Sequence, residues 1–415
     1  MDDGFHFTIS IQEALQNRST VSTFAPFAYN TNGNGTDTRE FVGKTFAPVI
    51  PSFDFVWKKN RWAVMASFGI GGGGGTAEFG NGLASFESLV AQLPFGVGMQ
   101  AAGKPLPYSM DMNIKGSSMT FQGQVGVAFK ITEWLSVAAQ ARLNYATKSY
   151  NGYLRNIQMN NPMSGQMAPA AAIFQGLAAT TTPGSAEYVQ YMTYAAMTAD
   201  HTLDVSQSGW SISPVVAAMF RLDGWAVTAK YEFRQAITLE NKTADVTAND
   251  PVLGTMFPNG AKTKADMPAL LSIAASKTIR DKVTITGEWH YYFDKDANNS
   301  FTPAIKRNTM EYLAGVEYKI NDKWLVSAGY QFTDYTLDAA LYSDLDFQCD
   351  AHAVGIGLAY NFNKHIRLNA GAMGVFYSDV VKESTVYNGN SLGLPGKDIF
   401  KNSRYCWGLG VDFHF

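Results

Sequence analysis

Long apolar runs are missing from this sequence, and their absence excludes membrane-spanning helices. No stretch approaches the roughly 18 uncharged apolar residues that such a helix requires, although 46% of the 415 residues are hydrophobic. If the chain crosses a bilayer, it does so with strands, because only helices and closed barrels satisfy every backbone group in lipid. A chain of this length usually forms about two or three soluble domains, but one large barrel also accommodates it.

The sequence also has few cysteines and a small net charge. The first excludes a disulfide scaffold or a metal cluster, and the second disfavours nucleic acid as a partner. Cys349 and Cys406 are the two cysteines, which is too few for a disulfide scaffold or a metal cluster. On the predicted strands both thiols point inward from strands separated by a third, roughly 9–10 Å apart, which exceeds disulfide range. We therefore predict two free thiols, and we expect no metal or other cofactor. The formal net charge of -3 provides no clustered basic face for nucleic acid. Residues 1–4 show no basic segment followed by an apolar core, so we recognise no secretory signal.

Catalytic motifs are absent from the sequence as well. It contains no Gly-x-Ser-x-Gly elbow and no His-Glu-x-x-His zinc helix, and its six histidines are scattered. The glycine run at 71–75 is followed by no Lys-Ser or Lys-Thr pair, so it is not a phosphate-binding loop. We therefore predict no catalytic residues and a protein that is not an enzyme.

The sequence is rich in segments that alternate apolar and polar residues. From Trp225 to Phe233 alternate residues are apolar, whereas Lys230 and Glu232 belong to the other set. A period of two places the two sets on opposite faces of a strand. A barrel in lipid turns its polar face inward. A soluble β-rich protein with buried aromatics, the competing interpretation, turns the polar face to water.

Short polar turns separate these segments, and each is typical of a tight hairpin. Several of the strands that follow begin with Trp. The turns lie at 58–61, 130–133, 222–224, 280–282, 321–323 and 361–365. With terminal strands at 5–12 and 404–415 they predict about fourteen strands, an even number as bacterial single-chain barrels require.

The remaining connections are long, and an asymmetry of short turns and long loops is typical of outer-membrane barrels. We expect the long loops at 13–46, 71–108, 148–208, 235–266, 294–308, 334–349 and 378–403. The predicted fold is therefore all-β: one transmembrane antiparallel up-and-down barrel over residues 1–415. Short helices are expected in the extracellular loops 71–108 and 148–208. The terminal Phe415 also resembles the carboxy-terminal assembly signal of such barrels.

Several segments resemble a known family in their order and spacing. They are Phe46–Gly82, with its two prolines and its Gly-then-Glu-Phe ending, and the later stretches NDKWLVSAGYQF and LAYNFNKHIRLNAGAM. Together they resemble the FadL family of long-chain fatty-acid transporters, which also includes aromatic-hydrocarbon channels. The resemblance covers nearly the whole chain and implies the strand count given above. It departs from the family at the start, because the family's amino-terminal hatch, with its Asn-Pro-Ala type motif, is missing here.

The two longest loops carry apolar residues at helical spacing, before Pro94 in the first loop and in Met-rich stretches in the second. Packed together, these amphipathic helices would leave a hydrophobic groove, and flexible thioether side chains suit a greasy ligand. The resemblance implies that such a groove captures the ligand. The alternative is that the apolar faces only cap the barrel mouth. The candidate groove residues are Leu83, Phe86, Leu89, Val90, Leu93, Phe95, Met167, Phe174, Leu177 and Met192.

Charged residues fall on the rows predicted to face the lumen, and most of them should form structural networks. A fatty acid nevertheless needs a cation for its carboxylate. Arg142, Lys230 and Arg234 are the candidates for that role, and their parity along the strands is the reason for the choice.

A run of five glycines ends the predicted third strand, where the backbone is free to bend. The resemblance implies that this strand is kinked and leaves a lateral gap through which substrate passes into the membrane. A flexible start to the loop is the alternative. The run consists of Gly71, Gly72, Gly73, Gly74 and Gly75.

The expected function is passive uptake of hydrophobic small molecules across the cell outer membrane. Long-chain fatty acids are the favoured class, and aromatic hydrocarbons are the second. A surface adhesin or ligand receptor on the same barrel is one alternative. A general polar porin is another, which the apolar loops disfavour. Membrane lipids and lipopolysaccharide are the expected surroundings of a protein that acts as a monomer.

Overall fold

Fourteen strands of the computed structural model form one closed antiparallel barrel, as predicted. The structure describes residues 3–299, 305–335, 337–339, 342–345 and 347–415. The barrel closes where β18 pairs with β1 along almost its whole length. The barrel strands are β1 (Gly4–Phe24), β2 (Thr38–Lys59), β3 (Trp62–Phe79), β4 (Tyr108–Lys130), β5 (Leu135–Asn160), β7 (His201–Leu222), β8 (Trp225–Glu232), β11 (Leu270–Ile279), β12 (Val283–Tyr292), β13 (Met310–Lys319), β14 (Trp324–Asp334), β15 (Ala351–Asn361), β16 (Ile366–Tyr377) and β18 (Gly396–His414).

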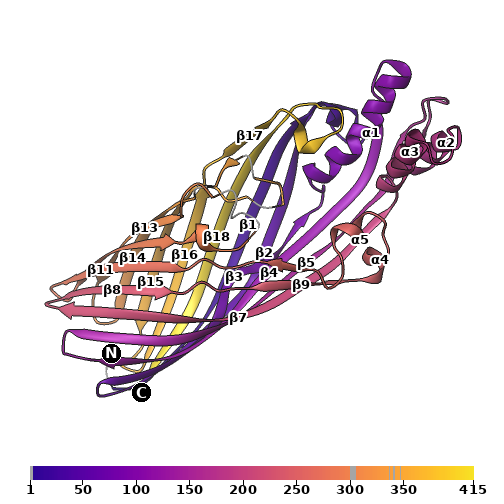
Figure 1. The fold of residues 1–415 in the computed structure, drawn as a ribbon. Coiled ribbons are helices and arrows are strands. Elements are labelled where there is room, and N and C mark those ends of the chain that lie inside the picture. Colours follow the sequence, from indigo (N-terminus) through magenta and orange to yellow (C-terminus); the bar gives the residue numbers. More distant parts are fainter. Residues whose placement is uncertain (1–2, 300–304, 336, 340–341, 346) are drawn as a thin grey trace.

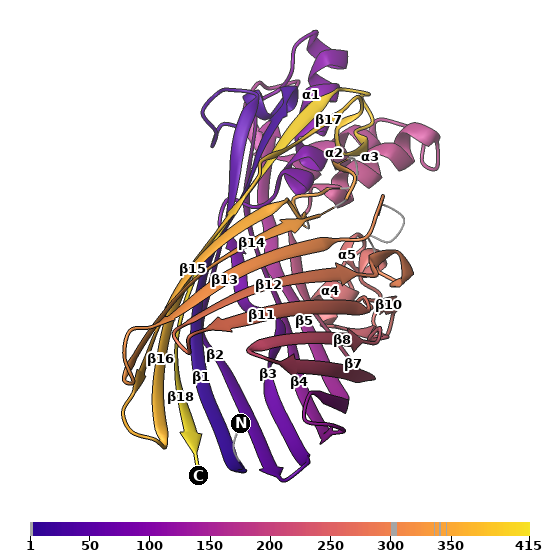
Figure 2. The ribbon, with the colours of Figure 1, turned by 90° about the vertical axis from the view of Figure 1, so that its left-hand side faces the viewer.

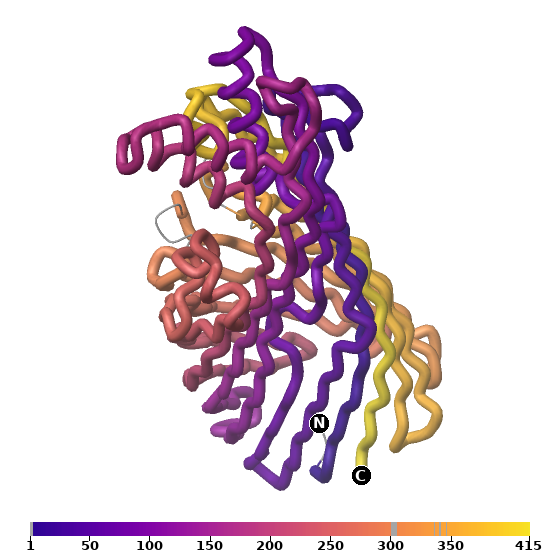
Figure 3. Tube along the Cα trace, turned by 90° about the vertical axis from the view of Figure 1, so that its right-hand side faces the viewer, coloured from indigo at the N-terminus to yellow at the C-terminus, as the bar shows by residue number. Residues whose placement is uncertain are grey.

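The loops add short strands and helices at one end of the barrel, which we call the loop end (Figure 1). Both chain termini lie at the opposite turn end (Figures 2 and 3). No helix in the described part of the chain has the length and apolar character that crossing a membrane requires. The loop elements are β6 (Met167–Pro169), β9 (Thr238–Thr243), β10 (Lys262–Lys264), β17 (Val380–Ser384), α1 (Ala84–Ala102), α2 (Ala170–Ala179), α3 (Ala186–Met197), α4 (Asp245–Ala248), α5 (Leu253–Met256), η1 (Ala25–Tyr29), η2 (Asp294–Asp296) and η5 (Tyr387–Gly389).

All six predicted hairpins are present at the turn end, which confirms the turn analysis. The turn between β7 and β8 shows how two residues can connect a pair of antiparallel strands. Asp223 has a φ of 48° and Gly224 a φ of 73°. Two consecutive residues with positive φ match the right-handed twist of the flanking strands, so the hairpin closes without splaying.

The apolar rows face outward, and the polar rows face the lumen. Trp225 and Trp324 are 49% and 40% exposed on the outer surface. Glu232, from the opposite row of β8, is 8% exposed. An outer surface of this kind suits hydrocarbon rather than water, and it contradicts the soluble alternative with buried aromatics.

One half of the barrel wall is taller than the other. Strands β1–β5, β7 and β18 have 18 to 26 residues, whereas β8 and β11–β16 have 8 to 12. The predicted loops 13–46 and 148–208 are therefore too long: the strands leave residues 25–37 and 161–200 to connect them. The extensions were missed because polar residues such as Arg18 and Ser22 break the alternation there, although they still pair in register with β2 and β18.

Above this tall wall the loops share a buried cluster, the loop core, in which η1, α1, α2 and η5 pack on the inner faces of the tall strands. The larger members of the loop core are Phe24, Phe27, Phe41, Leu83, Val90, Leu93, Leu106, Tyr108, Met110, Met112, Ile114, Ile157, Met159, Ile173, Phe174 and Tyr387.

Helix α1 does not end before Pro94, as the sequence suggested, but continues to Ala102. Proline removes one backbone donor from a helix, and here the buried Val90 and Leu93 hold the helix on the loop core. The helix ends at Gly103, whose φ of 63° is the left-handed conformation that glycine adopts at little cost.

Candidate functional site

An apolar cavity of about 80 Å³, the loop cavity, lies between α1 and the inner wall at the loop end. One side is formed by α1 and the end of α3, the other by β4, β5, β7 and α5. Almost all of the lining side chains are aliphatic, aromatic or thioether groups, so the cavity suits the apolar part of a ligand, and its volume is smaller than the roughly 300 Å³ at which pockets for whole ligands begin. The lining residues are Phe86, Leu89, Val90, Ile114, Tyr153, Leu154, Met197, His201, Leu203, Val252, Leu253 and Met256.

The predicted groove residues divide between the loop cavity and other places. Phe86, Leu89 and Val90 line the cavity. The cavity also lies between the two loops that the sequence paired, since Met197 belongs to the second of them. Whether these residues bind a ligand stays a prediction.

Six of the other predicted groove residues serve the loop core or face solvent. Leu83, Leu93 and Phe174 are buried in the loop core. The partly buried Leu177 packs against it, while Met167 and Met192 are exposed. The alternative interpretation, that such residues only cap the barrel mouth, also stays a prediction. The tenth residue, Phe95, packs its ring against that of Tyr29, with 5.8 Å between the ring centroids.

No pattern in the sequence indicates the third loop of the cavity. Val252, Leu253 and Met256 come from loop 235–266, in which a single turn of helix is too short to show an amphipathic pattern. The imidazole that lines the cavity, His201, has no signature in the sequence either. Its Nδ1 lies 2.7 Å from Oδ2 of Asp250, a residue 49 positions away, and such a contact leaves no mark in local spacing.

Helix α1 is fixed by a buried carboxylate, Glu87, which is 1% exposed. Its Oε1 accepts hydrogen bonds of 2.8 Å from Asn30 and from the hydroxyl of Tyr108. The guanidinium of Arg39 forms an ion pair with the same oxygen. These partners come from three segments of the tall wall and its first loop, so a single side chain ties α1 to all of them.

Loops from the opposite part of the sequence also hold α1. Oδ2 of Asp344 accepts a 2.7 Å hydrogen bond from the backbone N–H of Ser85, in the first turn of the helix. Oε1 of Gln92 accepts one of 2.7 Å from the backbone of Ser391. A carboxylate at a helix amino terminus is favourably placed against the helix dipole. Burial, opposed by hydrogen bonds from Ser85, nevertheless raises the pKa of Asp344 above its ordinary value.

Two of the three predicted lumen cations share one acid. Glu232 forms an ion pair with Arg142 and another, of 2.7 Å, with Lys230. Arg142 also donates a 2.7 Å hydrogen bond to Gln124. Arg234 lies apart, where it donates to the backbone carbonyl of Asp296 at 2.8 Å. A ligand carboxylate would therefore have to compete with Glu232 for the first two cations.

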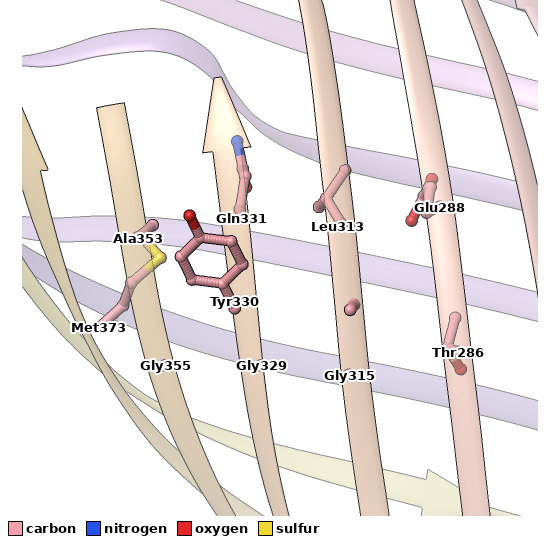
Figure 4. Close-up of a pocket in the computed structure, with 11 residues that line it drawn as sticks. Thr286, Glu288, Leu313, Gly315, Gly329, Tyr330, Gln331, Ala353, Gly355 and Met373 are labelled. Atoms are coloured by element: carbon pink, nitrogen blue, oxygen red, sulfur yellow. The ribbon is translucent and has the colours of Figure 1, made fainter. Parts of the chain in front are cut away.

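A second hollow, of about 290 Å³, lies along strands β12–β16 (Figure 4). Three glycines that lie side by side on neighbouring strands, Gly315, Gly329 and Gly355, contribute no side chains there. Glu288 and Gln331 form part of its border. No group of three or more His, Cys, Asp or Glu side chains in the described ranges is arranged to hold a metal ion.

The five glycines lie inside β3 rather than at its end, because β3 continues to Phe79. They lie in an interval, the wall gap, in which residues 47–52 of β2 and 69–75 of β3, all of them described, form no strand pairs with each other, although the side chain of Ile50 lies next to Gly74. Pro48 and Pro51 lie on the β2 side, and proline cannot donate to a sheet. On the β3 side, a Cβ at Gly73 would lie 1.9 Å from the carbonyl oxygen of Ser118, so this position requires glycine.

Comparisons with known proteins extend this description. Models of protein families and curated protein sequences give no match to the chain. Among solved structures, a Pseudomonas aeruginosa FadL homologue matches with a TM-score of 0.63 and 14% identity, covering 100% of this chain and 91% of that one. The chain has the FadL-type fold. The toluene transporters TodX of P. putida and TbuX of Ralstonia pickettii match with TM-scores of 0.55 and 0.54, each at 14% identity.

The FadL-type matches cover the whole of this chain and about nine tenths of each partner: 91% of TodX and 90% of TbuX. Identity this low shows a shared barrel and not a shared ligand. The ligand of this FadL-type barrel therefore depends on its own loop cavity, lumen and wall gap.

Proposed function

We propose that the protein is an outer-membrane channel for the passive uptake of hydrophobic compounds. The loop cavity captures the compound, and the wall gap releases it sideways into the membrane. The observation that carries the proposal is the combination of these two features in one FadL-type barrel: an apolar cavity under α1 and an unpaired interval that contains prolines and glycines. Neither an apolar cavity nor an exit into lipid favours a polar solute.

Two substrate classes fit this proposal. Long-chain fatty acids are favoured by the lumen cations Arg142 and Lys230, although Glu232 already pairs with both. Monoaromatic compounds are supported by the names of the solved toluene transporters TodX and TbuX. The flexible Met197 and Met256 in the cavity lining suit ligands of either shape.

A surface receptor is the second candidate function, and the outer side of the loops favours it. Met163 is 82% exposed and Val189 is 55% exposed, both in the segment that carries α2 and α3. Exposed apolar residues of this kind are common at binding surfaces when they form a patch. A receptor would lose its binding when residues 161–200 are deleted, while uptake would continue.

Reconstitution of the purified chain tests the proposal directly. We expect saturable binding of dodecanoate or toluene together with little steady single-channel conductance, because capture in the loop cavity and lateral release require no continuous polar path through the barrel. Large, stable conductance without binding of either compound would contradict the proposal and favour a polar porin.

A further inference from the structure

One buried polar atom beside the loop cavity has no partner in the protein. His201 is 6% exposed, and its Nε2 makes no hydrogen bond with any described residue. Leaving such a group unpaired costs about 1–3 kcal/mol, and each exception calls for an explanation. Because His201 lines the cavity beside Phe86 and Leu203, the explanation lies in what the cavity holds.

Asp250 fixes the orientation of this imidazole. Its Oδ2 lies 2.7 Å from Nδ1 of His201, and its Oδ1 accepts hydrogen bonds of 2.9 and 2.8 Å from the backbone N–H groups of Val252 and Leu253. Burial raises the pKa of Asp250, but the hydrogen bonds from His201 and from these N–H groups outweigh burial and hold the pKa below its ordinary value. The carboxylate is therefore ionised at neutral pH.

An ionised carboxylate only accepts hydrogen bonds, so Nδ1 of His201 carries the proton. Nε2 of the neutral ring is then an acceptor, and Nε2 of the protonated ring is a donor. The neutral ring can therefore accept a hydrogen bond from a hydroxyl group, and the protonated ring can donate one to a carboxylate or hydroxyl oxygen. Apart from the phenol of Tyr153, the other side chains of the cavity are apolar, so His201 is the polar group best placed to recognise a ligand.

We infer that His201 selects molecules with an apolar body and one oxygen head group, a hydroxyl or a carboxylic acid, and that it disfavours plain hydrocarbons. The inference rests on the proposed function and adds a polar requirement to it. An alcohol or a protonated acid donates its O–H to the neutral ring, and a carboxylate accepts from the protonated ring. A hydrocarbon such as toluene leaves Nε2 buried and unpaired.

The test measures how the full-length protein in detergent binds dodecane, dodecanol and dodecanoate, by displacement of a hydrophobic fluorescent probe. We expect dodecanol and dodecanoate to bind about three- to tenfold more tightly than dodecane, the range that one hydrogen bond provides. His201→Asn keeps an amide donor near the position of Nδ1, so the bond to Asp250 survives and only Nε2 is lost. In this variant the preference for an oxygen head group over dodecane should shrink to less than about twofold.

Two matched variants separate recognition from simple damage. His201→Gln places its amide near the position of Nε2 and should restore the preference for an oxygen head group. Leu89→Trp fills the cavity and should weaken all three ligands alike, so their ranking stays. The heat-dependent mobility of the folded barrel in detergent gels confirms assembly of each variant.

Three results would overturn the inference. The wild-type protein could bind all three compounds equally, or the preference could persist in His201→Asn; both results leave the proposed uptake function intact. Failure of the wild-type protein to bind any of the three compounds would overturn the inference and the proposed function together.

Discussion

The hydroxyl of Tyr108 donates a 2.8 Å hydrogen bond to Glu87 inside the loop core. This bond joins the first residue of β4 to the first turn of α1. Arg39 completes the site with an ion pair from β2. The charged oxygen is surrounded by aromatic and aliphatic side chains, which makes its partners indispensable.

Replacing Glu87 by Ala should therefore loosen α1. The substitution leaves the groups of Arg39 and Tyr108 without their acceptor, and breaking a buried pair in this way costs roughly 3–5 kcal/mol. Hydrogen exchange of the backbone amides of residues 84–102 measures the local opening free energy. Glu133→Ala, on the exposed turn between β4 and β5, is the control and should change it by less than about 0.5 kcal/mol. Equal effects of the two substitutions would refute the anchoring role.

The docking of α1 should also depend on pH through Asp344. Burial raises the pKa of this carboxyl above its ordinary value of 3.8, so its stabilising contribution is complete below pH 3.8 and is lost as the pH rises through the raised value. Asp344→Asn should remove this dependence and increase the exchange protection of α1 at neutral pH. Asp322→Asn, on an exposed turn at the other end, serves as control. Unchanged pH dependence in Asp344→Asn would contradict the assignment.

The sequence predicted the barrel well because lipid imposes a strict rule on every strand. The rows that contain Trp225 and Trp324 had to alternate, and tight turns such as Asp223-Gly224 had to close, so both were visible locally. The upper part of the tall wall was not visible in the local pattern. Above the apolar band, residues such as Arg18 face polar and loop partners rather than lipid, so the alternation is lost. The pair His201 and Asp250 could not be predicted, because it depends on how two distant loops fold over the barrel.

Releasing the lumen cations from Glu232 should favour an acidic ligand. Glu232→Gln leaves Arg142 and Lys230 without their carboxylate, and a charge-assisted hydrogen bond contributes about 1.5–3 kcal/mol. Dodecanoate should then bind at least about tenfold more tightly, with dodecanol unaffected. Glu240→Gln, from an exposed ion pair with Lys262, is the matched control. If dodecanoate binding does not change in Glu232→Gln, these cations do not meet the ligand.

The sidedness of the wall can be tested on neighbouring strands. Ile356 lies near the middle of β15 and is 66% exposed on the apolar outer surface. Ile356→Arg should reduce the free energy of unfolding in lipid vesicles by roughly 2–4 kcal/mol, the cost of a cation at the bilayer midplane. Ser327→Arg, on the lumen face of β14, should cost much less. The opposite ranking would mean that the faces are assigned the wrong way round.

Lateral release through the wall gap is the central claim, and a reversible lock across the gap tests it most directly. A Cβ at Gly69 would lie 3.5 Å from the Cβ of Ser52, within disulfide range, so Ser52→Cys with Gly69→Cys should form a bridge between β2 and β3. Cys349 and Cys406 are replaced by alanine to exclude other pairings.

The measurement is uptake of labelled dodecanoate by cells that carry the locked protein, alongside binding to the purified barrel. Oxidation should abolish uptake and leave binding intact, and a reductant should restore uptake. Gly123→Val, on the neighbouring strand with open space around it, should have no effect. Undiminished uptake through the oxidised, fully cross-linked barrel would contradict the lateral route.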